Sequence, residues 1–136
     1  MIIGINHITL SVHDLPQSMT FYIETLGCKL LAKWDRGVYL LAGDLWLCLT
    51  LDHKTRDSAL PEYTHFAFNV SSENFSTIAE KIKKAGITIF KENTSEGDSL
   101  YFLDPNGHKL EIHTSDWRAR IAACKKAPYS GMEFFI

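Results

Sequence analysis

The sequence predicts an α+β fold made of two similar units, each a strand, a helix and three further strands. Two alternating segments, His7–Val12 and His65–Val70, are each followed by a helical pattern that ends at a glycine, Gly27 or Gly86. The two histidine-to-glycine spacings are 20 and 21 residues, which indicates an internal repeat. Three short strand-like segments follow each helix, so each unit is βαβββ.

Length and composition are typical of one globular domain. The chain has 136 residues, of which 46% are hydrophobic and 22% charged. We expect a single domain over 1–136, with one module over about 1–60, a second over about 61–114, and a C-terminal helix and tail over 115–136. The formal net charge of -2, with no stripe of lysine and arginine, argues against a nucleic-acid partner.

The chain shows no feature of export or membrane insertion. It does not open with a basic segment followed by an apolar one, so we expect no export signal. The longest apolar runs, such as Leu45–Leu51, are too short to cross a bilayer. The three cysteines have no C-x-x-C spacing, which favours reduced thiols. We therefore expect a cytoplasmic protein with no membrane partner.

The first unit begins with a strand over 5–12. Asp14 is placed to cap a helix, Gln17 completes a capping-box pattern, and Pro16 is tolerated in a first turn. Gly27 then ends the helix. The apolar residues at helical spacing are Leu15, Met19, Tyr22, Ile23 and Leu26. The strands that follow are predicted over 28–34, 36–42 and 45–52, with a turn at Gly43-Asp44.

The second unit repeats this order after a connection over 52–62. A strand over 64–70 leads to Ser71-Ser72 and a helix that ends at Gly86. One face of that helix carries Phe75, Ile78, Ala79 and Ile82. The further strands are predicted over 87–91, 99–103 and 108–114, with a turn at Asn106-Gly107. A last helix carries Trp117, Ile121 and Cys124 on one face.

The polar faces of these strands predict a pocket with a metal site. Side chains alternate along a strand, so His7 and Thr9 share one face, and Glu111 lies opposite the apolar Leu110 and Ile112. Two histidines and one carboxylate, His7, His65 and Glu111, make a three-ligand site with positions open for a substrate.

Other side chains are open to a second interpretation. His113 shares the face of Glu111 and is its rival as a ligand, whereas His13, His53 and His108 are expected on turns or rims. Trp46 fits either the pocket or the core. Cys48 reads as a buried strand thiol because no cation or histidine adjoins it in sequence.

Several longer motifs then resemble a known family. They are Gly43–Leu49, Tyr63–His65, Ser95–Ser99, Tyr101–Pro105 and Ala122–Cys124. With the paired βαβββ units, they resemble the vicinal-oxygen-chelate superfamily, which includes glyoxalase I, bleomycin-resistance proteins and dioxygenases. Within it the chain is similar to the glutathione-dependent fosfomycin-resistance transferases of the FosA type. The resemblance spans Asn6 to Met132.

The resemblance implies a domain-swapped homodimer whose sites are shared between subunits. Each metal site would take His7 from one subunit and His65 and Glu111 from the other. The implied cofactors are Mn(II) as the metal and K+ as an activator, and glutathione is the implied cosubstrate. The metal would hold the oxygens of fosfomycin while the glutathione thiolate opens the epoxide ring.

Family positions also imply a role for each further site residue. Those carried over as catalytic are Thr9, Tyr39, Lys91 and Arg120. The phosphonate pocket would contain Thr9, Trp46, Tyr63, Lys91, Ser95, Ser99, Tyr101 and Arg120. Glutathione would approach Trp34, Arg36, Tyr39, Thr50 and Lys91, and K+ would bind the loop of Asn93, Ser95, Gly97 and Ser99. Two cations and several hydroxyl donors suit a doubly charged phosphonate.

Rival functions of the same fold remain open. A fosfomycin epoxide hydrolase needs a carboxylate to activate water, and Gly37 stands where such enzymes are expected to have a glutamate. A drug-sequestering protein would lack the metal residues. A transferase that uses another thiol differs only in surface residues that the sequence does not rank.

Overall fold

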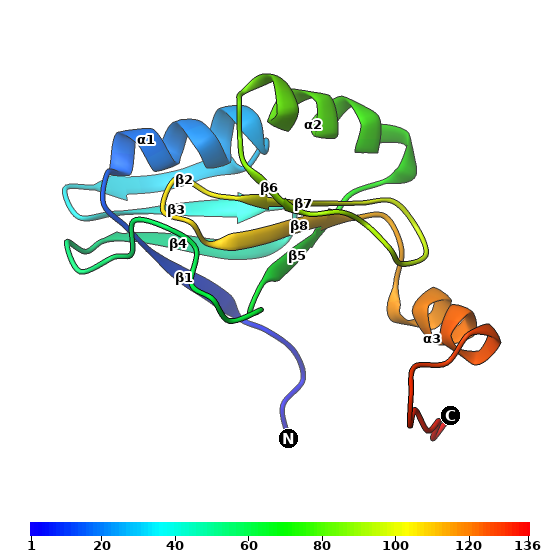
Figure 1. The fold of residues 1–136 in the computed structure, drawn as a ribbon. Helices are drawn as coiled ribbons and strands as arrows, with labels where there is room; N and C mark the ends of the chain where they lie inside the picture. Colours follow the sequence, from blue (N-terminus) through cyan, green and yellow to red (C-terminus); the bar gives the residue numbers. More distant parts are fainter.

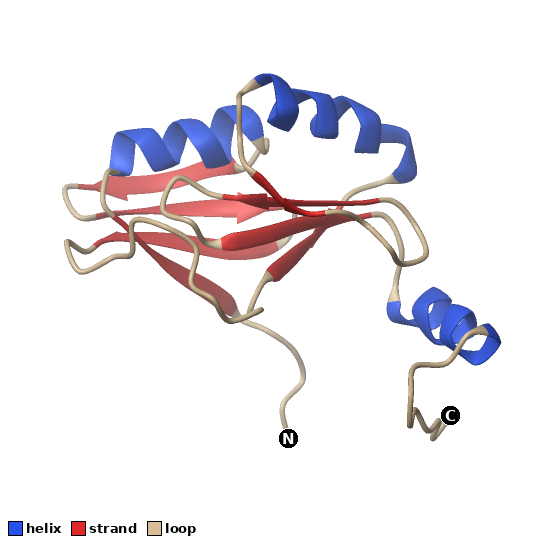
Figure 2. Ribbon diagram, in the orientation of Figure 1, coloured by secondary structure: helices blue, strands red, loops and turns tan.

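The fold consists of two four-stranded sheets with two helices along one side, in a computed structural model that describes residues 1–136. Figures 1 and 2 show the helices of both units above the sheets, with α3 set apart below. The first sheet has the order β1-β4-β3-β2 and the second β5-β8-β7-β6. No helix is long and apolar enough to cross a membrane.

Module 1, as we name the first unit, contains one sheet and one composite helix. Its first and last strands, β1 and β4, pair in parallel, and the remaining pairs are antiparallel. The elements are β1 (His7–Val12), α1 (Leu15–Met19), the π-helix η1 (Thr20–Thr25), β2 (Lys29–Trp34), β3 (Gly37–Ala42) and β4 (Leu45–Leu51).

Module 2, the second unit, has the same strand order and the same parallel pairing of its first and last strands. Its elements are β5 (Phe66–Asn69), α2 (Ser72–Lys84), β6 (Ile89–Lys91), β7 (Ser99–Leu103) and β8 (Lys109–His113). The chain ends with α3 (Trp117–Lys126) and a tail. The predicted order of elements is confirmed, with strand ends shifted by one or two residues.

The first helix differs from the expected regular α-helix. Asp14 caps it as predicted, because its carboxylate accepts a hydrogen bond of 3.0 Å from the Gln17 amide. From Thr20 onward, however, the helix widens into a π-helix. This widening buries the adjacent residues Phe21 and Tyr22 together, whereas the expected α-helical face contained Tyr22 and omitted Phe21.

The modules share one core and are joined by polar contacts at the β7–β8 turn. The Tyr22 hydroxyl donates a 2.6 Å hydrogen bond to Asp104 Oδ2 in the β7–β8 turn. In the same turn, His108 Nε2 donates a hydrogen bond of 2.9 Å to the Ser11 carbonyl of β1. His108 thus lies in a turn, which was one of the two expected places, but its side chain is buried and not on a rim. A Cβ on Gly107 would lie 2.4 Å from the backbone of Ala59, so this turn packs tightly on the connection between the modules.

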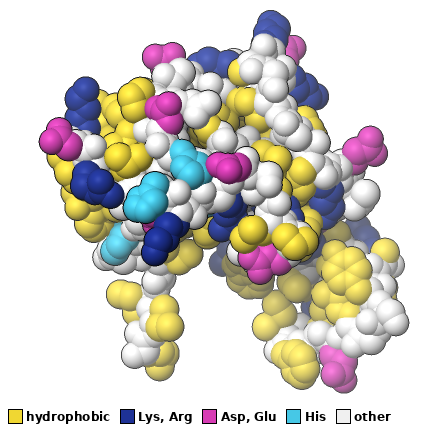
Figure 3. Space-filling model, turned by 60° about the vertical axis from the view of Figure 1, so that its left-hand side comes forward, with side chains coloured by type: hydrophobic (Ala, Val, Ile, Leu, Met, Phe, Trp, Pro, Cys, Tyr) yellow, Lys and Arg dark blue, Asp and Glu magenta, His cyan; other side chains and the backbone are white.

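Both ends of the chain expose apolar side chains, visible in yellow at the bottom of Figure 3. At the N-terminus these are Met1, Ile2, Ile3 and Ile5, and near the C-terminus they include Trp117, Tyr129, Phe135 and Ile136.

Candidate functional site

His65 and Glu111 form a converging pair of metal-ligand types in module 2. His65 lies just before β5, Glu111 lies in the middle of the adjacent β8, and the Glu111 side chain is buried. His65 Nε2 is 3.0 Å from Glu111 Oε2. His65 Nδ1 lies 3.3 Å from the Tyr63 carbonyl, which can only accept, so the proton of a neutral ring belongs on Nδ1. The lone pair of Nε2 then faces a carboxylate oxygen, an arrangement that a cation between the two would satisfy.

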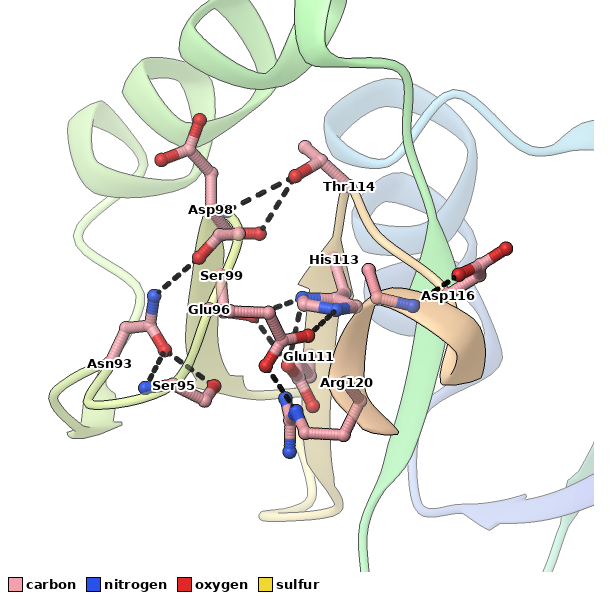
Figure 4. Close-up of polar contacts among 12 residues, drawn as sticks. Asn93, Ser95, Glu96, Asp98, Ser99, Glu111, His113, Thr114, Asp116 and Arg120 are labelled. Atoms are coloured by element: carbon pink, nitrogen blue, oxygen red, sulfur yellow. Dashed lines mark hydrogen bonds and ion pairs between the residues drawn. The ribbon is translucent and has the colours of Figure 1, made fainter. Parts of the chain in front are cut away.

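Two further side chains fix the other carboxylate oxygen of Glu111. The Ser99 hydroxyl donates a hydrogen bond of 2.6 Å to Glu111 Oε1 and also lies 2.6 Å from His113 Nδ1. The antiparallel register, which pairs Ser99 with His113, brings these side chains together. His113 Nδ1 itself is 3.7 Å from Glu111 Oε1. In this arrangement His113 supports the carboxylate through Ser99, as Figure 4 shows.

Lys91 is held beside this pair by aromatic side chains. Its ammonium donates to the Tyr63 hydroxyl and lies 4.6 Å and 4.8 Å from the ring centres of Tyr63 and Tyr101. The hydrogen bond to Tyr63 is the main cause that raises the pKa of Lys91, and the charge of Glu111 adds to it. Module 2 therefore presents a fixed cation next to its metal-ligand pair.

A second cation, Arg120, reaches the same region from α3. Its Nε donates to Glu96 Oε2 in the loop between β6 and β7. Partial burial works to lower the pKa of Arg120, but the hydrogen bond and charge of Glu96 raise it above its ordinary value. The chain thus offers two cations, Lys91 in β6 and Arg120 in α3, which are the two that the resemblance assigns to the phosphonate.

The loop between β6 and β7 is closed by Asn93. The Asn93 amide donates 2.9 Å to the Gly97 carbonyl, and its oxygen accepts from both the amide and the hydroxyl of Ser95 at 3.0 Å. Several oxygens therefore lie close together in the segment where K+ was expected, although the Asn93 oxygen is already engaged within the loop.

Module 1 carries a row of aromatic rings across its sheet instead of a charged network. The rings of His7 and Trp46 are 4.6 Å apart between centroids, Trp46 and Tyr39 are 5.2 Å apart, and Tyr39 and Trp34 are 4.8 Å apart. Trp46 is only half-buried, so it belongs to this row and not to the apolar core. Thr50 is exposed, and Arg36 donates 3.0 Å to the Leu51 carbonyl.

The three predicted metal ligands do not meet within one chain. His7 Nδ1 lies 2.7 Å from the Asn6 side-chain oxygen, and no three His, Cys, Asp or Glu side chains converge as a metal site. Thr9 lines a cavity of about 250 Å³ that contains neither His65 nor Glu111. The described chain therefore holds two halves of the predicted site, one on each sheet.

Sequence reasoning missed Glu96 and underrated His113. The alternation along β8 already placed His113 beside Glu111, and this was the available signal for a supporting role. Glu96 had no such signal, because it lies in a loop whose fold depends on contacts with Thr114 and Ser115, far along the chain.

Comparisons with known proteins identify the family of the chain. A family model described as the glyoxalase/bleomycin resistance protein/dioxygenase superfamily matches residues 4–112. The chain is 50% identical to glutathione transferase FosA of Serratia marcescens, over 98% of this chain and 96% of that protein. It is 36% identical to metallothiol transferase FosB of Lysinibacillus sphaericus, over 97% of this chain and 96% of that protein.

A solved relative carries a ligand relevant to the site. It is a variant of the fosfomycin resistance protein FosX of Listeria monocytogenes, in complex with Mn(II) and 1S,2S-dihydroxypropylphosphonic acid. The TM-score is 0.77 at 28% identity, with 89% of this chain and 99% of that chain covered.

Proposed function

The chain belongs to the glyoxalase/bleomycin resistance protein/dioxygenase superfamily, and on this premise we propose that it is a metal-dependent glutathione transferase that opens the epoxide ring of fosfomycin. The observation that carries this function is the 50% identity with a glutathione transferase over nearly the full chain. The result of this activity would be resistance to fosfomycin.

Gly37 favours the transferase over an epoxide hydrolase. A Cβ at this position would lie 2.4 Å from the Trp34 ring, so a glutamate there would displace that tryptophan from the aromatic row. Without a carboxylate at this place, the attacking group is an external thiolate and not an activated water.

The donor set of module 2 fits the Mn(II) ion that this function needs. One imidazole nitrogen and one carboxylate oxygen converge at 3.0 Å, and the hydrogen bond from His65 to the Tyr63 carbonyl favours the tautomer of a metal ligand. When bound, the metal supplies Lewis-acid activation of the epoxide oxygen.

The third ligand, His7, would come from a second copy of the chain. Because His7 lies on module 1 and the other two ligands on module 2, a homodimer that pairs unlike modules would complete two equivalent sites. This arrangement also brings the aromatic row of one copy to the charged network of the other.

The phosphonate would be bound mainly by the two cations. Lys91 and Arg120 would make charge-assisted contacts with its oxygens. The uncharged groups that would add hydrogen bonds or shape are Thr9, Trp46, Tyr63, Ser95, Ser99 and Tyr101. Together they would orient the ring so that the epoxide carbon bearing the phosphonate faces the thiol.

The glutathione thiol would be delivered from the aromatic face of module 1. Trp34, Arg36 and Thr50 would contact the peptide, and Tyr39 and the nearby cation Lys91 would favour the thiolate. As the C–S bond forms with inversion, the ring C–O bond breaks and its electron pair stays on the oxygen, which then takes a proton. The product is therefore an adduct of the two reactants.

Two accompanying conditions follow from this proposal. K+ would bind the loop of Asn93, Ser95, Gly97 and Ser99 and raise the affinity for the phosphonate. The reaction would take place in the cytoplasm, where glutathione is kept reduced, in keeping with three cysteines that form no disulfide.

A product assay tests the function. Fosfomycin and Mn(II) are incubated with the protein, with and without glutathione and K+, and the product masses are determined by mass spectrometry. We expect an adduct whose mass is the sum of both reactants, and negligible turnover without thiol. A diol formed without glutathione would indicate a hydrolase, a preference for bacillithiol or cysteine would indicate another thiol transferase, and binding without product would indicate a sequestering protein.

A mixing experiment tests the shared site. His7→Ala and Glu111→Ala chains, each inactive alone, should regain activity when unfolded and refolded together, because some mixed dimers keep one complete site. An active species that sediments as a monomer would contradict the shared site.

A further inference from the structure

Glu96 is fixed in place by a loop that packs on the segment between β8 and α3. The Asp98 amide donates a hydrogen bond of 3.1 Å to the Thr114 hydroxyl, and the Thr114 amide donates one of 3.1 Å to the Asp98 carbonyl. Gly97 has a φ of +73°, and a Cβ there would lie 2.9 Å from the Ser115 side chain. Because the backbone is held at this point, the Glu96 side chain turns inward, where it is only 19% exposed.

The Glu96 carboxylate occupies the middle of a chain of contacts. Its Oε2 accepts from Arg120 Nε on one side, and its buried Oε1 lies 3.8 Å from His113 Nε2 on the other. His113 then meets the Ser99 hydroxyl, which donates to Glu111. Figure 4 shows Glu96 between Arg120 and the β8 side chains.

The way in which Glu96 binds Arg120 leaves part of the guanidinium for another anion. Glu96 uses only Nε, so it does not occupy the two terminal nitrogens, and the Arg120 side chain remains 36% exposed although the Tyr129 hydroxyl also lies near enough to raise its pKa. A guanidinium fixed through one edge presents its other donors in a set direction, which suits bidentate binding of a tetrahedral anion.

We propose that Glu96 is a positioning residue that orients Arg120 for the phosphonate of the substrate. This inference rests on the proposed function for the identity of the anion. Glu96 itself does not touch the reacting atoms, and it acts by limiting the rotamers of Arg120 and anchoring the first turn of α3 to the β6–β7 loop.

Fosfomycin binding without thiol is the test, measured by calorimetry on the Mn(II)-loaded protein. Glu96→Gln should weaken binding about tenfold, as expected for loss of an outer partner that orients a ligand-binding group. Mn(II) affinity and the melting temperature should change little. The matched control is Glu92→Gln, which removes the same charge from the exposed start of the same loop and should bind as the parent does.

A double-substitution cycle shows whether Glu96 acts through Arg120. In an Arg120→Ala background, Glu96→Gln should cause no further loss, because the group that it positions is gone. An undiminished tenfold loss in that background, or equal binding by the Glu96→Gln and Glu92→Gln proteins, would overturn the proposal. If Glu96→Gln does not fold, Glu96→Asp keeps the charge but shortens the reach, and unchanged binding by that variant would equally overturn it.

The failure of this inference is distinguishable from failure of the proposed function. Adduct formation with normal binding by Glu96→Gln would refute the positioning role alone. Fosfomycin binding that depends on Glu96 and Arg120, with no thiol adduct, would refute the transferase and leave the positioning role intact.

Discussion

The two modules have the same strand order but carry different chemistry on it. Module 2 has a connected polar network, in which the Ser99 hydroxyl lies within hydrogen-bonding distance of both Glu111 and His113. Module 1 instead carries on its sheet the aromatic row of His7, Trp46, Tyr39 and Trp34. The comparison teaches that one backbone plan supports a polar, charged face in module 2 and a face of aromatic rings in module 1.

The difference begins in the strands and loops, not in the helices. In module 2 the loop between β6 and β7 is long enough to reach α3 and bring in Glu96, whereas the equivalent strands β2 and β3 of module 1 are joined by the short turn at Asp35-Arg36. Neither module alone contains three converging side chains of the metal-ligand types, so the proposed metal site would need residues from both kinds of module.

The largest expected effect comes from removing the metal ligand of module 2. Glu111→Ala should lower activity by about a thousandfold or more, since Lewis-acid activation contributes several kcal/mol. Because module 2 holds two donors and module 1 one, Glu111→Ala should also weaken Mn(II) binding more than His7→Ala does. Manganese titration followed by electron paramagnetic resonance measures the Mn(II) affinity of both variants. If His113→Ala abolished Mn(II) binding while Glu111→Ala did not, the ligand assignment would be wrong.

Removing a cation from module 2 should weaken fosfomycin binding, whereas removing one from module 1 should weaken glutathione binding. Lys91→Ala should weaken fosfomycin binding about ten- to a hundredfold, or roughly 1.5–3 kcal/mol for one charge-assisted contact. Arg36→Ala, on module 1, should instead raise the KM for glutathione and leave fosfomycin binding nearly unchanged. Calorimetry with fosfomycin and kinetics with varied glutathione distinguish the two. An equal effect of both variants on fosfomycin binding would break the comparison.

The hydrogen bond between Tyr22 and Asp104, which joins the modules, should contribute to the free energy of unfolding. Tyr22→Phe leaves a buried oxygen of Asp104 without its donor, which should lower the free energy of unfolding by about 1–3 kcal/mol. Urea unfolding measures this value. The control is Tyr129→Phe, which removes a hydroxyl that interacts with Arg120 from a side chain that is 61% exposed, so stability should change little. Equal stability of the two variants would mean that the hydrogen bond does not hold the modules together.

The smallest effect concerns pH and is confined to module 1. Burial raises the pKa of the Cys28 thiol from 9.0 to about 11. The unfolded chain loses this proton near pH 9 and the folded chain keeps it longer, so the contribution to stability is complete below pH 9 and is lost as the pH rises toward 11. Between pH 8 and 10 the loss should be about 1 kcal/mol. Urea unfolding at both pH values should show it in the parent and not in Cys28→Ala.

The sequence predicted the repeated architecture because each element carries its own local signal. The Asp14 cap forms as expected, and Ser71 caps the second helix in the same way, each with a hydrogen bond from the amide three residues later. Alternation also predicted correctly which face of β8 carries Glu111. These features depend on residues a few positions apart, which is the range that periodicity and capping rules cover.

Features that depend on distant contacts were outside that range. The π-helix at Thr20–Thr25 and the burial of His108 both follow from packing between the modules. The pairing of Arg120 with Glu96 needs the docked loop. The separation of His7 from His65 and Glu111 is a matter of module arrangement, on which local patterns carry no information.

The turn that joins β7 to β8 also bears on the order of folding. Tyr22 and Asp104 are 82 residues apart, and all sheet pairings close shorter loops within one module. Because closing a longer loop costs more chain entropy, we expect the strands of each module to pair first and this contact to form late. A contact absent from the transition state affects the unfolding rate almost alone. The turn would then act as a kinetic lock, setting how long the folded chain survives and not how quickly it forms.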